Sequence, residues 1–356
     1  MDASTANSQI SYSSAKNRRC FHKLTWYSLL LGGLFAAILV AFSIGKYPTS
    51  PPEIIRFFLH WAGLAEMDNG RFDALHNVLI DIRLPRILVA MLVGATLSVA
   101  GAAFQSVFRN PLVSPGLLGV QSGAAFGAAL GILLGLSWPL IQGLAFLLGL
   151  VAVFASVLIA NVFGQSSMVM LVLGGMISNA FFSSLLSVIK YVADPMNVLP
   201  SIVYWLMGNL ALANMHQVLI FAGPLLVGIL ALSFCGRLLD ALSMGDDEAR
   251  SIGIPVHWTR YSLIAITTMI SALTVSVAGT IGWVGLLIPH IVRLLLGPAN
   301  TRVLPASIIL GAIFLLLADV ISRCIANTEI PIGIVTEILG IPVFLMVLKR
   351  SRKGWH

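Results

Sequence analysis

The sequence contains few charged residues. Asp, Glu, Lys and Arg together make up 10% of its 356 residues, whereas soluble domains contain roughly 25%. The longest stretch without any of them lies between Arg109 and Lys190, and it could cross a bilayer about three times at about 20 residues per crossing. This scarcity excludes a soluble globular protein and predicts an all-α polytopic membrane protein.

Motifs that carry chemistry are equally scarce. The sequence has no Gly-x4-Gly-Lys-Ser/Thr phosphate loop and no His-Glu-x-x-His zinc helix. Cys20, Cys235 and Cys324 are scattered, without the spacing of a metal site or a disulfide framework. His290 stands alone near the end of an apolar run, where a packed residue is the more common outcome. We therefore expect no catalytic residue, no metal site and no cofactor bound by this chain.

Ionisable residues inside the apolar runs are rare as well. Proton- or sodium-driven carriers need such residues deep in the membrane, and here Asp319 and Glu337 are the only acids near an apolar run. Asp319 stands four residues before Arg323, which makes this arginine a natural intrahelical partner. A secondary transporter is therefore disfavoured, although it remains the alternative from another class. The chain is expected to draw its energy from a partner.

The apolar runs predict ten transmembrane helices in a single domain over residues 23–350. Cytosolic tails of residues 1–22 and 351–356 flank this domain. The expected bounds are about 24–44, 83–108, 218–235, 261–278, 283–296, 304–322 and 333–348, with the third, fourth and fifth spans inside residues 115–190. A short outside helix is expected from Pro51 through Trp61, and a second non-crossing segment over residues 194–214. Gly123, Gly127 and Gly131 give the third span a bare face for close helix packing.

Ten crossings place both ends of the chain on one side of the membrane. With that topology, fourteen Lys and Arg residues lie on the side of the basic tails and seven on the other side. Positive residues accumulate on the cytosolic side of membrane proteins, so both termini are predicted to be cytosolic. The net charge of +7 then reflects topology, and binding of nucleic acid is not expected.

A polar island, Leu239–Pro255, interrupts the apolar sequence on the predicted cytosolic side. Gly245 is expected to divide it into two short helices, with Asp246 as the N-cap of the second. Gly253 and Pro255 are expected to end that second helix. Such a folded, charged element predicts a partner in water. Its charged residues are Asp240, Asp246, Asp247, Glu248 and Arg250.

Four sequence blocks carry a family resemblance. They are 83–119, which begins Arg83-Leu-Pro-Arg86, then 241–253 in the polar island, 278–293, and 317–342. In this order, across about residues 24–350, they closely resemble the FecCD-type permeases of type II ABC importers, the class that contains the ferric-siderophore, haem and vitamin B12 permeases. The resemblance implies the type II ABC importer permease fold, with ten transmembrane helices per subunit.

The resemblance also implies the partners. The permease would be a homodimer in the cytoplasmic (inner) membrane of a bacterium or archaeon, with two cytosolic ABC ATPase subunits and a periplasmic substrate-binding protein. ATP and Mg would be used by the ATPase subunits. A ferric siderophore or haem is the first expectation for the cargo, and cobalamin or an oxyanion such as molybdate or tungstate are the alternatives.

Three groups of residues receive roles from the resemblance. The segment 237–257 would form the ATPase-coupling helices. The three arginines of the second group would form an outward cation cluster, because the matching arginines of the vitamin B12 member face carboxylates of its binding protein. The third group would close the cytoplasmic gate. The coupling residues are Leu242, Gly245, Asp246, Asp247, Glu248, Ala249, Arg250 and Gly253; the docking residues are Arg83, Arg86 and Arg323; the gate residues are Asn110, Leu112, Ser167 and Met168.

Overall fold

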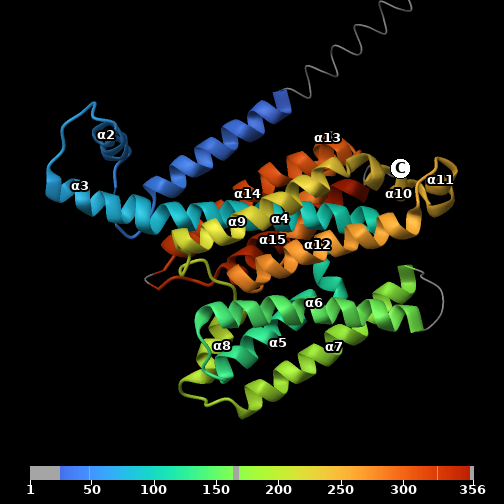
Figure 1. The fold of residues 1–356 in the computed structure, drawn as a ribbon. Helices are drawn as coiled ribbons and strands as arrows, with labels where there is room; N and C mark the ends of the chain where they lie inside the picture. Colours follow the sequence, from blue (N-terminus) through green and yellow to red (C-terminus); the bar gives the residue numbers. More distant parts are fainter. Residues whose placement is uncertain (1–24, 48, 163–167, 327, 353–356) are drawn as a thin grey trace, which may run out of the picture.

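The protein folds as a bundle of long helices that lie side by side (Figure 1). The computed structural model describes residues 25–47, 49–162, 168–326 and 328–352, and these residues contain no β-strand. The prediction of an all-α protein is therefore confirmed for this part of the chain.

Ten apolar helices account for the predicted spans. In the described residues, seven are long and apolar enough to cross a membrane: Thr25–Ser43, Asn69–Val107, α6 (Trp138–Val162), α7 (Met168–Val192), α9 (Met215–Phe234), α12 (Val256–Ala278) and α14 (Asn300–Cys324). Three have shorter apolar stretches: α5 (Val120–Leu133), α13 (Val284–Leu296) and α15 (Ile332–Arg352). Together they correspond to the ten predicted spans.

α4 (Leu84–Val107) forms the centre of the bundle and is buried along most of its length. Glycines allow the backbones of α13 and α14 to approach α4 closely. A Cβ atom on Gly101 would lie 1.8 Å from the Gly285 carbonyl oxygen of α13, and one on Gly94 would lie 2.2 Å from the Gly311 carbonyl oxygen of α14. Small residues at such positions let helix backbones pack directly in lipid, so α4 is fixed between α13 and α14.

α5, α6 and α7 form a second group of helices on one side of the α4 bundle (Figure 1). A Cβ atom on Gly123 or Gly127 of α5 would lie 2.4 Å from a carbonyl oxygen of α6. This confirms the predicted packing role of these small residues. α8 (Val198–Leu206) has only nine residues and, at about 1.5 Å per residue, is too short to cross, as predicted for the segment 194–214.

A helical appendage precedes α4. α2 (Pro51–Trp61) begins with a capping box formed by Ser50 and Glu53. α3 (Asn69–His76) begins at the N-cap Asp68 and continues through the π-helical segment η1 (Asn77–Arg83) into α4. The second span was expected to begin at Arg83, but its helix extends outward as far as Asn69, because Asp68 caps it and no proline interrupts residues 69–84.

Candidate functional site

The polar island folds as two short helices. α10 (Gly236–Met244) and α11 (Asp246–Ser251) meet at Gly245, whose φ of 144° lies outside the range that L-residues readily adopt. After α11, the Gly253 amide donates to the Arg250 carbonyl at 2.9 Å, and the Ile254 amide donates to the Ala249 carbonyl at 3.1 Å. These two bonds form a Schellman motif. The predicted division at Gly245 and the helix end at Gly253 are confirmed.

Asp246 does not cap α11, which corrects the sequence prediction. Gly245 occupies the N-cap position, and no side chain caps this helix. The Asp246 carboxylate instead accepts a hydrogen bond from Arg260 of α12 at 2.6 Å and lies 3.4 Å from the Arg109 guanidinium. The hydrogen bond from Arg260 lowers the pKa of Asp246, and the charge of Arg109 acts in the same direction. Two cations therefore hold this carboxylate in its ionised form.

The two helices have one buried side and one exposed side. Leu239, Leu242 and Ala249 are buried against the rest of the protein. Asp247, with 92% of its side chain exposed, and Glu248 face outward. We use the term coupling knob for residues 236–254, which thus present acidic side chains to solvent from an apolar base.

A second polar link joins the coupling knob to α4. Asp240 of α10 accepts a hydrogen bond from the backbone amide of Asn300, at the start of α14, at 2.6 Å. The Asn300 side chain in turn accepts from the hydroxyl of Ser106, in the last turn of α4, at 2.7 Å. These contacts join residues that are 60 and 194 positions apart in the chain, and sequence patterns gave no sign of them.

The predicted gate turn lies beside the coupling knob. Arg109 has a φ of 50°, which is uncommon for a residue with a side chain. The Asn110 side chain accepts from the Leu112 amide at 2.9 Å, and Leu112 is 57% exposed. The Arg109–Asp246 ion pair connects this turn directly to α11. The third span begins at Val120, after the 3-10 turn η2 (Pro115–Leu118), and not at Pro115–Gly116 as expected.

The second predicted gate segment is only partly described. Ser167 lies outside the described residues. Met168 is the first residue of α7 and is partly buried against the main hydrophobic core. The gate role of Ser167 and Met168 therefore stays a prediction.

The three predicted docking arginines lie close together, but they are buried. Their exposed fractions are 4% for Arg83, 7% for Arg86 and 6% for Arg323. Arg86 contacts Asp319 at 2.8 Å and Glu329 at 2.9 Å, and Arg323 contacts Asp319 at 3.1 Å. Carboxylates of the same chain thus pair with two of the arginines, and the docking role of the three stays a prediction. The predicted Asp319–Arg323 pair is confirmed.

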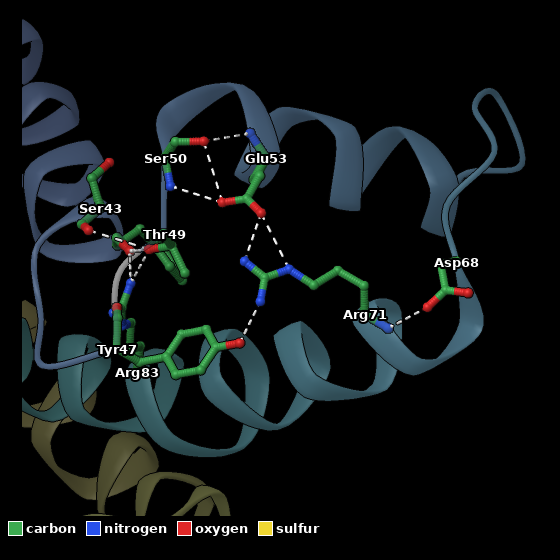
Figure 2. A network of polar contacts seen from close by, with 9 residues as sticks. Ser43, Tyr47, Thr49, Ser50, Glu53, Asp68, Arg71 and Arg83 are labelled. Carbon is green, nitrogen blue, oxygen red and sulfur yellow. Dashed lines mark hydrogen bonds and ion pairs between the residues drawn. The ribbon is translucent and has the colours of Figure 1, made fainter.

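Arg83 is the arginine of this group that has neutral partners. It donates to the Tyr47 carbonyl and to the Thr49 hydroxyl, each at 2.6 Å, and to the Phe42 carbonyl (Figure 2). The three arginines, together with Lys46 and Glu329, line a cavity of about 180 Å³. With Asp319 buried behind Arg86 and Arg323, this region has more cations than carboxylates, which favours an incoming anionic group.

Two further cavities lie among the spans. One of about 330 Å³ is lined by aromatic residues that include Trp138, Tyr204 and Trp205, and one of about 220 Å³ is lined in part by Gln121 and Trp283. No charged side chain lines either cavity. Within the described ranges, no group of three or more His, Cys, Asp and Glu side chains is placed to hold a metal ion.

We expect Asp246→Asn to loosen α11. The substitution removes the charge that pairs with Arg260, and the loss should be about 1.5 kcal/mol, or roughly a tenfold shift in the local opening equilibrium. Hydrogen exchange of the amides 246–251 measures this opening. Lowering the pH through the depressed pKa of Asp246 should have the same effect, because protonation removes the same charge.

Asp247→Asn is the matched control for this experiment. Asp247 is the next residue and is 92% exposed, and among the described residues its one ion pair is with Arg250 of the same helix, at 3.1 Å. An exposed pair of this kind contributes about 0.5 kcal/mol or less. Equal protection of α11 in the Asp246→Asn protein and the parent would show that the Arg260 contact does not hold the knob.

The arrangement of these elements agrees with one protein family. Residues 33–350 match the FecCD transport family. The chain is 37% identical to the molybdate import system permease protein MolB of Haemophilus influenzae, over 90% of this chain and 94% of that protein. It is 40% identical to the probable iron chelatin transport system permease protein of Helicobacter pylori strain 26695, over 80% of this chain and 86% of that protein.

A solved structure shows the same fold. It is described as an inward-facing conformation of a metal-chelate type ABC transporter, and it superposes with a TM-score of 0.80 at 35% identity, covering 91% of this chain and 99% of that chain. The chain therefore belongs to the FecCD transport family. It is a multi-pass membrane protein and a permease of the type II ABC importers.

Proposed function

We propose that this permease imports a metal chelate, delivered by a periplasmic binding protein, and that two cytosolic ATPase subunits drive the transport. The coupling knob is the observation that carries this proposal. It offers exposed acids at Asp247 and Glu248, and its buried base contacts α4, α12 and α14. An element that binds a partner in water and packs against several spans is suited to transmit a movement between them.

The ion pairs of Asp246 give the movement a route to the gate. When an ATPase displaces α11, the pair with Arg109 displaces the turn that carries Asn110 and Leu112, and the pair with Arg260 displaces α12. The gate would open and close as this turn and Met168, at the start of α7, move apart and together, and Ser167 would take part in the same closure. Gly245 and Gly253 supply the backbone conformations that hold the knob in shape for this task.

The arginine-lined cavity is the proposed docking site for the binding protein. Arg83, Arg86 and Arg323 face a space of about 180 Å³, and a carboxylate of the binding protein would find an excess of positive charge there. Complementary charges of this kind guide association and fix its orientation. Burial of the arginines gives the docking site selectivity, since only a projecting side chain reaches them.

The remaining parts of the proposal concern assembly and cargo. The permease would act as a homodimer in the cytoplasmic membrane of a bacterium or archaeon, with both termini cytosolic, a single domain over 23–350 and no cofactor of its own. ATP and Mg would be used by the ATPase. A ferric siderophore or haem is the proposed cargo, supported by the iron-chelate relative and by span cavities without charged lining. Cobalamin, and molybdate as in the Haemophilus relative, are the alternatives.

Uptake by reconstituted vesicles tests this proposal. The permease, its ATPase and its binding protein are combined with labelled ferric siderophore, haem, cobalamin or molybdate in turn. We expect ATP-dependent uptake of one of these and no effect of a protonophore. An ATPase variant that binds but cannot hydrolyse ATP is the control. Uptake that continues without the ATPase and collapses with the protonophore would establish a secondary transporter instead.

A further inference from the structure

We propose that α2 is a membrane-surface anchor, whose exposed apolar face lies in the lipid interface beside the end of the first helix, Thr25–Ser43. The proposal concerns a part of the chain that neither the coupling knob nor the arginine-lined cavity uses, so it is independent of the proposed function. The side chains of this face are Ile55, Phe58 and Leu59, which are 60%, 41% and 40% exposed.

α2 has two apolar sides, and only one of them packs inside the protein. Ile54 and Phe57 are buried with Leu75 and Leu79 of the α3–η1 helix. Ile55, Phe58 and Leu59 follow these residues directly in the sequence and therefore point elsewhere on the same helix. Three large apolar side chains exposed on one side of an eleven-residue helix form a patch that soluble surfaces seldom show.

Polar contacts fix the direction of this patch. Glu53 forms an ion pair with Arg71 of α3 at 2.6 Å, and Arg71 also donates to the hydroxyl of Tyr47 (Figure 2). Further along α2, the Arg56 side chain donates to the Glu66 carbonyl at 3.0 Å, and His60 contacts the Ala65 carbonyl at 2.9 Å. Because the polar side chains of α2 are engaged with α3 and its preceding loop, the helix cannot readily rotate to hide the apolar face.

The position of α2 indicates that lipid contacts this face. The ring of Phe58 lies 6.4 Å from that of Phe42, in the last turn of the first helix. That helix is the least buried of the long spans, with 11% of its window inside the protein. Leu39 and Ile44 near its end are 49% and 44% exposed. The apolar face of α2 therefore continues the lipid-facing surface of the first span.

The orientation of α2 also supports contact of this face with lipid. Figure 1 shows α2 end-on, whereas α4, α9 and α12 run across the picture, so α2 lies across the direction of the spans. An amphipathic helix parallel to the membrane plane buries its apolar face at the boundary between headgroups and acyl chains.

Spin-label accessibility tests the anchor. The full-length permease, with its three native cysteines changed to serine, receives one nitroxide at Ile55→Cys or Leu59→Cys and is reconstituted in vesicles of phosphatidylethanolamine and phosphatidylglycerol. We expect collisions with oxygen to exceed collisions with a water-soluble nickel chelate several-fold at both positions. Asp73→Cys is the matched control, because Asp73 is an exposed residue of α3 in the same appendage, and there the nickel chelate should dominate.

Two other results would overturn the proposal. Labels at positions 55 and 59 that behave like the label at 73 would show that the face is in water. Labels protected from both collision partners would show that protein covers the face, and repeating the measurement with and without the binding protein would distinguish that partner from a second copy of the permease. Each labelled protein must elute like the parent in size-exclusion chromatography. If Ile55→Cys does not fold, the label at Leu59→Cys provides the test.

Discussion

Reversing the charges of Asp247 and Glu248 will abolish co-purification of the permease with its ATPase subunits and leave the permease folded. Both side chains are exposed on the coupling knob, and in the part of the chain that the structure describes the one ion pair of Asp247 is with Arg250. The change therefore removes nothing from the core. Loss of a desolvated charge pair at an interface costs about 2–5 kcal/mol, so association should weaken by more than about thirtyfold. Affinity purification of the tagged permease, followed by quantification of the ATPase, measures this loss.

The matched control reverses two acids on the other side of the protein. Glu66→Lys with Asp73→Lys makes the same change in net charge, and both residues are exposed on the appendage formed by α2 and α3. This variant should keep the ATPase. Deletion of residues 243–253 is a second variant with the same expected loss, but it also removes Asp246 and leaves Arg260 without its partner. Undiminished ATPase binding and transport by the charge-reversed protein would refute the coupling role of the knob.

Replacing Asp319 with Leu will strongly destabilise the permease. Asp319 is completely buried and lies between Arg86 and Arg323, whose side chains are 8% and 7% exposed. Without Asp319, the Arg323 guanidinium loses its carboxylate and Arg86 keeps only Glu329. Breaking a buried pair from one side costs about 3–5 kcal/mol. Thermal unfolding in detergent, followed by size-exclusion chromatography, should show a lower midpoint and less folded protein.

Two further variants distinguish the two possible causes of this destabilisation, an unpaired buried charge and lost packing. Arg86→Met with Asp319→Leu and Arg323→Met removes the buried carboxylate and both of its cations together, and leaves only the 28% exposed Glu329 without Arg86. Replacement of a buried ion group by apolar residues is often neutral or stabilising. We expect this triple variant to recover most of the stability. Glu329→Gln should have a smaller effect than Asp319→Leu because its side chain is 28% exposed. An Asp319→Leu protein as stable as the parent would show that the arginines need no internal partner.

Local features of the site could be predicted from the sequence. The division of the coupling knob at Gly245 and its end at Gly253 follow from backbone conformations that glycine adopts and other residues avoid. The pairing of Asp319 with Arg323 follows from their spacing of four residues on one helix. In each case the deciding contacts lie within one helical turn or one short loop, and they are therefore visible in a single stretch of sequence.

The contacts that tie the site together could not be predicted. Asp246 was expected to cap its own helix because Asp is a preferred N-cap residue, but Gly245 occupies that position and the Asp246 carboxylate pairs with Arg260 and Arg109. The docking arginines received their role from the resemblance, which did not indicate that Arg86 and Arg323 pair with carboxylates of the same chain. Arg86 finds its partners in Asp319 and Glu329, which are more than two hundred residues away in the chain. Such partners meet only when the helices have packed.

The helix Asn69–Val107 runs without a break from the appendage to the turn at Arg109. At 1.5 Å per residue, its 39 residues form a rod of roughly 58 Å. Arg83 and Arg86 lie in the half of this helix that is nearer the appendage. The other end leads into the turn at Arg109, which contacts the coupling knob. On the proposed function, the binding protein at one end and the ATPase at the other would therefore act on one stiff body. If binding in the outer cavity changes the affinity of the inner turn for its ligand by some factor, binding at the inner turn changes the affinity of the outer cavity by the same factor.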